Sequence, residues 1–253
     1  WIYERQDQIS FLDGHVRAFA HFGGAPARVA YDNLRAAVVR ILVGGARTLT
    51  VRFAALASHY LVEACFCRPG EGHDKGGVES RGNAVRQQAL VPIPSGTTLA
   101  TINDVLLAQM DARLDTQRDA AGQTIGGRFA EEQGQFRLAP TLFAPEATTF
   151  ATVTPRALVR LEGAWYSVWT RWAGLDLVVR VGASMVTIVG RDGTCVHHPR
   201  KRFGERSIDY RHDLAELARK PQAVRQVLPD LLRDLGAPFP AIWDQLHGAH
   251  GPR

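Results

Sequence analysis

The sequence is poor in cysteine and has no long hydrophobic run. Cys65, Cys67 and Cys195 are its only cysteines among 253 residues. An odd number favours a reducing compartment over a disulfide framework. Cys65-Phe66-Cys67 lacks the CxxC spacing and Cys195 is distant in sequence, so we expect no zinc site. No apolar run approaches about 18 residues, so no transmembrane helix is expected.

The chain also lacks an acidic excess and the composition of a disordered protein. Lys and Arg number 30 against 25 Asp and Glu, which gives a net charge of +5 and a pI of about 9.4. A basic balance favours an anionic partner such as nucleic acid, although many basic proteins bind none. Hydrophobic residues make up 45% and charged residues 22%, which predicts a packed core. Residue 1 is Trp rather than Met, and no signal peptide follows, so we expect a piece of a longer protein.

Residues 1–95 alternate between strand-like and helix-like patterns. Apolar residues recur at helical spacing in some segments and form short buried runs in others. The order is strand 1–6, helix 7–22, strand 28–31, helix 50–60, strand 61–67 and helix 75–89. This alternation predicts an α/β layer architecture.

The pattern changes twice after residue 95. A long helix over 98–120 and connecting structure predict a helical linker over 96–150. Short strands punctuated by glycines then predict a small β-barrel over 151–204. We expect a helical tail over 205–253, interrupted at Pro221 and Pro229.

Two carboxylates are placed where they could serve phosphoryl transfer. Asp32 follows a buried strand, which would hold it rigidly, and Glu79 lies in the first turns of a helix. Carboxylate oxygens suit Mg²⁺, which keeps waters and substrate phosphates in its shell. Spacing alone leaves other roles open, because Asp32 can cap a turn and Glu79 can pair with Lys75 one helical turn away.

The strings around these acids are more specific than their spacing. The segment around Asp32 reads FGGAPARVAYDNL from Phe22, and the segment up to Glu79 reads HDKGGVE after His59-Tyr60 and Cys67-Arg68-Pro69. Together they resemble the second-Asp and Glu motifs of IstA-type bacterial insertion-sequence transposases, members of the DDE, retroviral-integrase-like superfamily. Tyr166-Ser167-Val168 and the run 211–221 also resemble that family, so the resemblance covers nearly the whole chain.

The resemblance implies a partial RNase H-like catalytic core over residues 1–95. In that fold the second Asp follows the fourth strand and the Glu lies on a helix after the fifth, which fits Asp32 and Glu79 if residues 1–4 are the third strand. The first catalytic Asp would then lie upstream of residue 1. Asp7 and Asp13 are not substitutes, because both fall on or beside the first helix. With two carboxylates, Mg²⁺ or Mn²⁺ would bind weakly.

Basic and amide side chains near the acids are candidates for DNA contact. Asn33 can contact DNA or position Asp32, and it can equally form a turn. Lys75 and Arg86 share a helix face with Glu79 at helical spacing, which suits phosphate contact, whereas Arg81 lies off that face. A solvated helix surface explains Lys75 and Arg86 equally well.

A second basic group lies in the predicted barrel. His197-His198-Pro199-Arg200-Lys201-Arg202 is the densest cluster of basic residues there, and Arg200, Lys201 and Arg202 are candidates to hold the DNA backbone. A solvated loop is the alternative. Trp165 and Trp169 share one face of a strand, so we expect them in the core, with base stacking the lesser alternative.

These features predict a DNA transposase that binds double-stranded element ends, cleaves them with Mg²⁺ or Mn²⁺ and joins them to target DNA. Asp32 and Glu79 would be catalytic metal ligands. The resemblance implies a homo-oligomer, an AAA+ ATPase helper, and a nucleoid-associated cytoplasmic location. One alternative is a non-catalytic DNA-binding and assembly fragment, favoured by the missing first acid. Another is a simple RNase H-like nuclease, which needs neither barrel nor tail.

Overall fold

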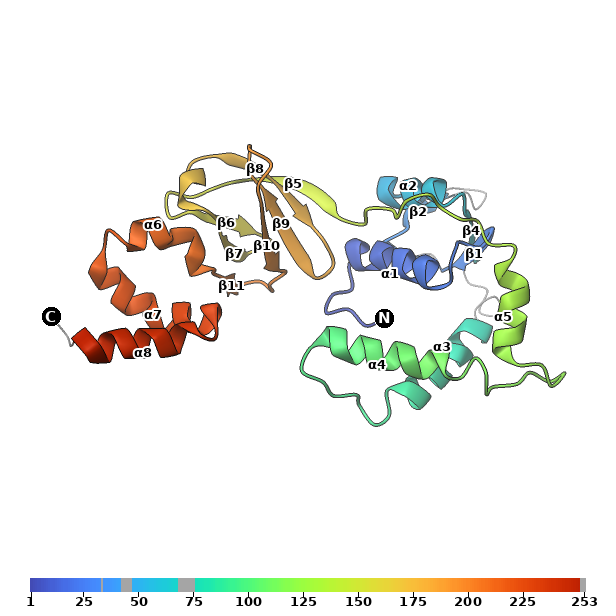
Figure 1. Ribbon diagram of the computed structural model, residues 1–253. Helices are drawn as coiled ribbons and strands as arrows, with labels where there is room; N and C mark the ends of the chain where they lie inside the picture. Colours follow the sequence, from blue (N-terminus) through green and yellow to red (C-terminus); the bar gives the residue numbers. More distant parts are fainter. Residues whose placement is uncertain (33, 42–46, 68–75, 251–253) are drawn as a thin grey trace. The chain divides into compact units, whose positions relative to one another are not determined.

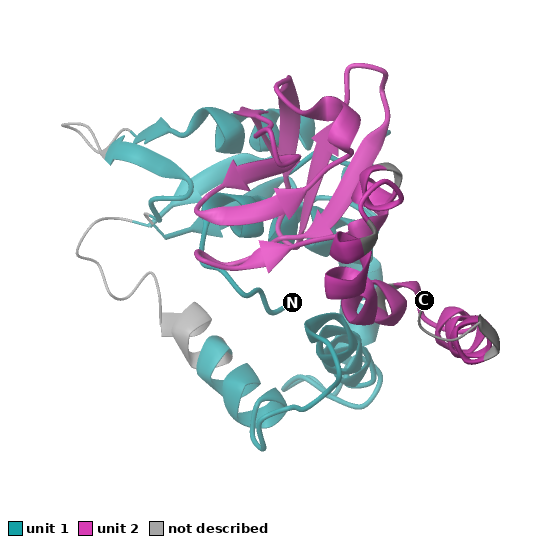
Figure 2. Ribbon diagram, turned by 90° about the vertical axis from the view of Figure 1, so that its left-hand side faces the viewer, with its two compact units in different colours: residues 1–145 teal, residues 146–253 magenta. Residues whose placement is uncertain are grey.

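The computed structural model describes residues 1–32, 34–41, 47–67 and 76–250, and the chain divides into two compact units. Unit 1 is Trp1–Pro145 and unit 2 is Glu146–Arg253 (Figures 1 and 2). Unit 1 combines helices with small sheets, and unit 2 combines antiparallel strands with a helical end (Figure 1). Within the described residues, no helix is both long and apolar enough to cross a membrane.

A pair of parallel strands lies at the centre of unit 1. Strand β1 (Arg28–Tyr31) pairs with β4 (Glu63–Phe66) in a register that sets Tyr31 opposite Phe66. The Cys67 N–H donates to the Tyr31 carbonyl at 2.9 Å and extends this pairing past the strand ends. Parallel neighbours need a crossover, and helix α2 (Val51–His59) supplies it. The mixed α/β class is confirmed, while the complete RNase H-like fold stays a prediction.

Helix α1 (Gln8–His21) packs its apolar face into the core of unit 1. Asp7 caps it, because its carboxylate accepts the Ser10 N–H at 2.8 Å. Leu12 of α1 is fully buried, and so are Phe53 and Leu56 of α2. Both helices were expected within two residues of these limits, because their apolar spacing and caps are local signals.

Residues 1–6 form no strand in the described part of unit 1, so that expectation is wrong. Instead, the amide of Asn103 pairs with the backbone of Ile2. The Ile2 N–H donates to Asn103 Oδ1 at 2.6 Å, and Asn103 Nδ2 donates to the Ile2 carbonyl at 2.9 Å. A side-chain amide thus satisfies the donor and acceptor that a neighbouring strand would otherwise take.

Three further helices and a hairpin complete unit 1. Helix α3 spans Gly76–Ala89, α4 spans Leu99–Asp111 and α5 spans Ile125–Gln133. The helix expected over 98–120 ends at Asp111. Turns follow it, and in one of them the Asp119 carboxylate accepts the N–H groups of residues 121 and 123.

No helix or strand was expected between residues 31 and 50. That stretch contains an antiparallel pair, β2 (Val38–Ile41) with β3 (Arg47–Leu49).

Unit 2 contains two small sheets. The first has the order β10-β9-β8-β5 and is antiparallel throughout, and the second has the order β11-β7-β6. The strands of the first are β5 (Ala147–Thr152), β8 (Asp176–Val181), β9 (Met185–Val189) and β10 (Cys195–Pro199). Those of the second are β6 (Leu158–Leu161), β7 (Ala164–Ser167) and β11 (Arg206–Ser207). Short strands are found where they were expected, except that β5 begins before residue 151 and β11 lies after residue 204, in the expected helical tail. Closure into a barrel stays a prediction.

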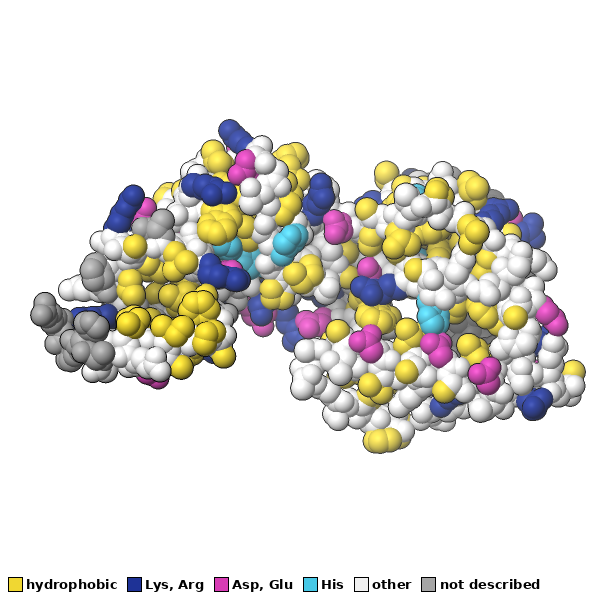
Figure 3. Space-filling view, viewed as in Figure 1, with side chains coloured by type: hydrophobic (Ala, Val, Ile, Leu, Met, Phe, Trp, Pro, Cys, Tyr) yellow, Lys and Arg dark blue, Asp and Glu magenta, His cyan; other side chains and the backbone are white. Residues whose placement is uncertain are grey.

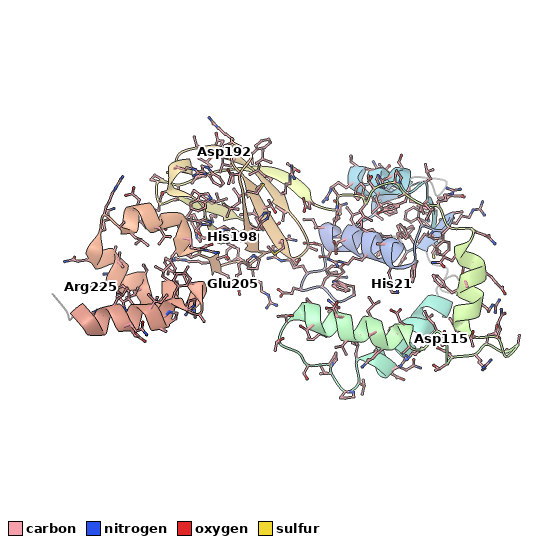
Figure 4. The ribbon with its side chains drawn as sticks, viewed as in Figure 1. His21, Asp115, Asp192, His198, Glu205 and Arg225 are labelled. Atoms are coloured by element: carbon pink, nitrogen blue, oxygen red, sulfur yellow. The ribbon has the colours of Figure 1, made fainter. Side chains whose placement is uncertain are left out.

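A buried hydrogen-bond network joins the two sheets to the chain that follows them. His198 of β10, which lies amid the strands (Figure 4), donates from Nε2 to the Ser167 carbonyl of β7 at 2.7 Å. The Ser167 hydroxyl contacts His212 Nδ1 at 2.9 Å and accepts the Asp209 N–H at 2.7 Å. All three side chains of this Ser–His–His network (Ser167, His198, His212) are buried.

The end of unit 2 is helical. It comprises the short 3-10 turns η2 (Thr170–Trp172) and η3 (Tyr210–Asp213) and the helices α6 (Leu214–Leu217), α7 (Pro221–Leu235) and α8 (Phe239–His250). Pro221 opens α7, where a proline needs no N–H partner. The expected break at Pro229 is wrong, because α7 continues through it. Hydrophobic side chains gather over α7 and α8 (Figure 3), and those of Phe239, Ile242 and Leu246 are about half exposed.

The Ser–His–His network predicts a pH dependence of stability. Burial lowers the pKa of both His198 and His212 below 6.5, so the folded chain binds protons less readily than the unfolded chain. The contribution of the two neutral histidines to the free energy of unfolding is therefore fully present above pH 6.5 and is lost as the pH falls below 6.5. We expect the free energy of unfolding of wild type to fall between pH 7 and pH 5, and that of His198→Gln/His212→Gln to fall less. Urea titrations at several pH values measure this, and equal slopes would contradict it.

Candidate functional site

Asp32 lies at the carboxyl end of β1, as expected. It follows Tyr31 directly and its side chain is exposed. Because β1 and β4 are parallel neighbours, their carboxyl ends meet at one edge of the sheet. The chain leaving β4 reaches α3, whose first turns include Glu79. Asn33 and Lys75 lie outside the described residues, and for Glu79 the structure gives only its place on α3.

A cluster of aromatic side chains fixes the strand end that carries Asp32. Tyr31 is 6% exposed and its ring lies 5.0 Å from that of Phe53 and 5.7 Å from that of Phe66. Burial raises the pKa of Tyr31 to about 12, so this phenol stays protonated at neutral pH. This packed, uncharged aromatic cluster therefore holds the backbone of Asp32 in one position.

Arg47 brings positive charge to the same edge of the sheet. Its guanidinium donates to the Cys67 carbonyl at 2.8 Å and lies over the Phe66 ring at 5.7 Å. Cys67 is bonded in turn to Tyr31, the residue before Asp32. Nothing in the sequence pointed to Arg47, because the strand that presents it was not expected.

The arrangement suits a hard divalent cation, but the described residues alone do not complete a site. An exposed carboxylate at a rigid strand end can ligate a cation that keeps part of its water shell. Across the described ranges, no three His, Cys, Asp or Glu side chains gather closely enough to hold a metal. Asp7 is engaged as the cap of α1, and Asp13 accepts from Tyr3 at 2.6 Å and from Arg17 at 2.5 Å.

An apolar groove of about 1350 Å³ runs beside β1 and α1. Phe11, Phe19 and Val29 line it from α1 and β1, and Phe129 lines it from α5. Among the described residues β1 pairs with β4 alone, so the other edge of β1 is open beside this groove. An open edge next to an apolar surface has the features of a site for strand addition.

Arg86 and the basic cluster of residues 197–202 have different surroundings. Arg86 is exposed in the last turn of α3, where a cation also stabilises the helix dipole. The Arg200 side chain is only 4% exposed. It donates to both Glu162 oxygens, at 2.9 and 3.1 Å, and to the Gly182 carbonyl at 3.2 Å. Of the three candidates in this cluster, only Arg202 is fully exposed, and Lys201 is half-buried.

The core tryptophan is not the one expected. Trp172 is 3% exposed and Tyr166 is 1% exposed, while Trp165 and Trp169 are half-buried. Strand β7 alternates, so Tyr166 faces the core and Trp165 faces outward. Trp169 lies beyond the end of β7, which removes it from the strand face that its spacing suggested.

No protein-family model matches the chain, but curated relatives do. The transposase for insertion sequences IS1326/IS1353 of Pseudomonas aeruginosa is 33% identical over 90% of this chain and 46% of the relative. A transposase of Aminobacter aminovorans is 34% identical over 92% of this chain and 48% of the relative. The transposase for insertion sequence element IS21 of Pseudomonas aeruginosa is 28% identical over 70% of this chain and 46% of the relative.

The class that these relatives share is that of insertion-sequence transposases. The similarity confirms, over nine-tenths of the chain, the resemblance to the IstA-type transposases of the IS21 and IS1326 elements that the two acid motifs indicated. The chain spans about half the length of the curated relatives it matches, so the similarity covers only part of such a protein.

The ion pair of Arg200 predicts that this residue contributes to stability. Arg200→Gln removes a bidentate contact to Glu162 and a hydrogen bond to Gly182 from a buried position. We expect the free energy of unfolding to fall by about 1–2 kcal/mol. The neighbouring Arg202→Gln, at an exposed position, should change it by less than about 0.5 kcal/mol. Equal effects in urea titrations would show that the Arg200 contacts contribute nothing.

Proposed function

We propose that this chain is the part of a bacterial insertion-sequence transposase that carries the second and third carboxylates of a DDE catalytic centre. The observation that supports this most strongly is the topology of unit 1. Asp32 ends a strand whose parallel neighbour leads directly to the helix of Glu79. This is the order of elements that the family resemblance implies for its last two acids. The relatives supply the class, and the order of strands and helix supports the proposal that the two residues meet.

The proposed reaction is cleavage of the element ends and joining of the 3′ ends to target DNA. Bound Mg²⁺ or Mn²⁺ would activate the attacking water or 3′-hydroxyl and stabilise the leaving oxygen. Asp32 would hold its carboxylate at a fixed point on the sheet edge, and Glu79 would approach from α3. Asn33, Lys75 and Arg86 would position phosphates beside them, with Arg47 adding charge at the same edge.

The first carboxylate of the centre would come from outside this chain. We place it on a strand that adds to the open edge of β1, over the apolar groove. The relatives, about twice as long as the chain, have room for such a segment. A strand added there would lie next to Asp32 and would bury the half-exposed side chain of Val29, which lines the groove.

The same assignment leads us to propose substrates, partners and a location for the protein. The proposed substrates are double-stranded transposon ends and target DNA. Arg200, Lys201 and Arg202 stay candidates for contact with the DNA backbone, and Arg202 is the most accessible of the three. A homo-oligomer, an AAA+ ATPase helper and a bacterial cytoplasmic location follow from the family resemblance.

One specific observation favours a second candidate function. Asp7 and Asp13, the acids considered as substitutes for the first catalytic Asp, are engaged elsewhere, which suits a DNA-binding and assembly module that does not cut. Analysis of the DNA products of the full-length protein separates the candidates. Joined strands indicate a transposase, nicks alone indicate a nuclease, and metal-independent binding without either indicates the module.

The test of the catalytic assignment uses the full-length transposase that contains this chain. We expect Asp32→Asn and Glu79→Gln each to reduce strand joining by about a hundredfold or more, since each removes a ligand of the reacting centre. Asp104→Asn, an exposed acid on α4, is the matched control and should join strands like wild type. Retained binding of element-end DNA would show that the variants fold. Near wild-type joining by either variant would refute the assignment.

A further inference from the structure

The outward face of the three-stranded sheet in unit 2 carries a row of two arginines around a tryptophan. Strand register sets Arg206 of β11 opposite Trp165 of β7, and Trp165 opposite Arg160 of β6. The alternation of β6 and β7 turns these side chains away from the core, since Val159 and Tyr166 beside them are buried. This Arg–Trp–Arg row therefore forms one line across all three strands of the sheet.

Several arginines of unit 2 are engaged in ion pairs with described residues, and the two arginines of the row are not. Arg160 and Arg206 are exposed, and neither forms an ion pair with any residue that the structure describes. By contrast, Arg171 pairs with Asp192, Arg200 with Glu162, and Arg211 with Asp209. The guanidinium of Arg160 lies 5.6 Å from the centre of the Trp165 ring. Two guanidiniums without carboxylate partners can bind an outside anion without first breaking an ion pair.

A second exposed aromatic ring adjoins this row. Phe203 is 81% exposed and its ring lies against Gly163 in the turn between β6 and β7. A side chain at residue 163 would come within 2.1 Å of that ring, and the φ of +81° there also favours glycine. The Gly204 N–H donates to the Gly163 carbonyl at 3.1 Å and fixes the loop. The turn is thus built to hold an aromatic ring in solvent at the end of the β6–β7 hairpin, where Gly163 lies two residues before Trp165.

We propose that the Arg–Trp–Arg row, with Phe203, binds a DNA strand that has unpaired bases. The inference rests on the proposed transposase function and adds the surface of unit 2 that holds the DNA. A guanidinium donates paired hydrogen bonds to phosphate oxygens. The outer strands lie about 10 Å apart, so Arg160 and Arg206 can reach successive phosphates of one strand. An aromatic ring between them offers a stacking surface, which a base uses only when it is free of its own duplex.

The Arg–Trp–Arg row is better suited to bind DNA than the basic cluster of residues 197–202 that the sequence indicated. In that cluster Arg200 and His198 face inward, and Arg200 is already paired. In the row both cations face outward and flank an aromatic ring. Strand joining requires free 3′ ends, where a terminal base pair can open, and such an end supplies both the phosphate and the unpaired base.

Fluorescence anisotropy with labelled oligonucleotides tests the proposal on the purified chain. The test variant is Arg160→Gln/Arg206→Gln. The control is Arg180→Gln/Arg191→Gln, which removes the same charge from exposed positions on β8 and beside β9. Each protein is titrated at several salt concentrations with a single strand and with the matching duplex. We expect the test variant to bind the single strand about tenfold more weakly, with a salt slope smaller by about 1.4, and the control to match wild type.

Trp165→Leu and Trp165→Phe test the stacking contribution. Leu should weaken single-strand binding several-fold and leave duplex binding nearly unchanged, while Phe, which keeps a ring, should restore single-strand binding. Circular dichroism identifies any variant that fails to fold. If Trp165→Leu does not fold, the binding measured for Trp165→Phe and for Arg160→Gln/Arg206→Gln decides whether the row binds DNA.

Equal losses in the test and control arginine variants, or a wild-type affinity in the test variant, would overturn the proposed surface. Strand joining by the full-length protein would in that case still support the transposase assignment. A chain that binds neither oligonucleotide overturns the surface as well.

Discussion

The parallel pairing of β1 with β4 is the interaction on which the proposed chemistry depends. It brings two chain segments separated by the whole α2 crossover to one sheet edge, with Cys67 bonded to Tyr31 just past the strand ends. Asp32 follows the first strand and α3 follows the second. The aromatic packing of Tyr31, Phe53 and Phe66 makes this edge rigid, and a rigid edge is what a catalytic carboxylate requires.

In unit 2 the corresponding constraint is a buried polar network. His198, Ser167 and His212 connect one sheet to the other and both to the turn that begins the helical end. Buried polar groups are costly unless each finds a partner, so the network specifies one arrangement of these elements. With the interior fixed in this way, the outward faces of the short strands are available for binding, and the Arg–Trp–Arg row lies on one of them.

Local patterns in the sequence predicted the elements well where a single signal decided them. The apolar spacing and the Asp7 cap of α1, and the buried run of β1, are such signals. The strand expected over residues 1–6 fails because the Asn103 amide, distant in sequence, takes its place as partner. The continuation of α7 through Pro229 and the β2–β3 pair likewise depend on surroundings that no short window of sequence contains.

The same distinction applies to the functional residues. Asp32 and Glu79 were proposed as the acids from local motifs, and their roles stay a prediction. The inward turn of Arg200 depends on Glu162 and Gly182, and the outward turn of Trp165 depends on where β7 begins and ends. Arg47 was missed because its position follows from tertiary contact alone.

The central claim is that Asp32 and Glu79 share one divalent metal. Replacement of Mg²⁺ by Fe²⁺ in the full-length transposase, followed by peroxide, cuts the backbone next to the bound ion. The account predicts cuts near both residue 32 and residue 79, suppressed by excess Mg²⁺ and lost in Asp32→Asn. Cuts at only one of the two positions, or cuts that persist in that variant, would contradict it.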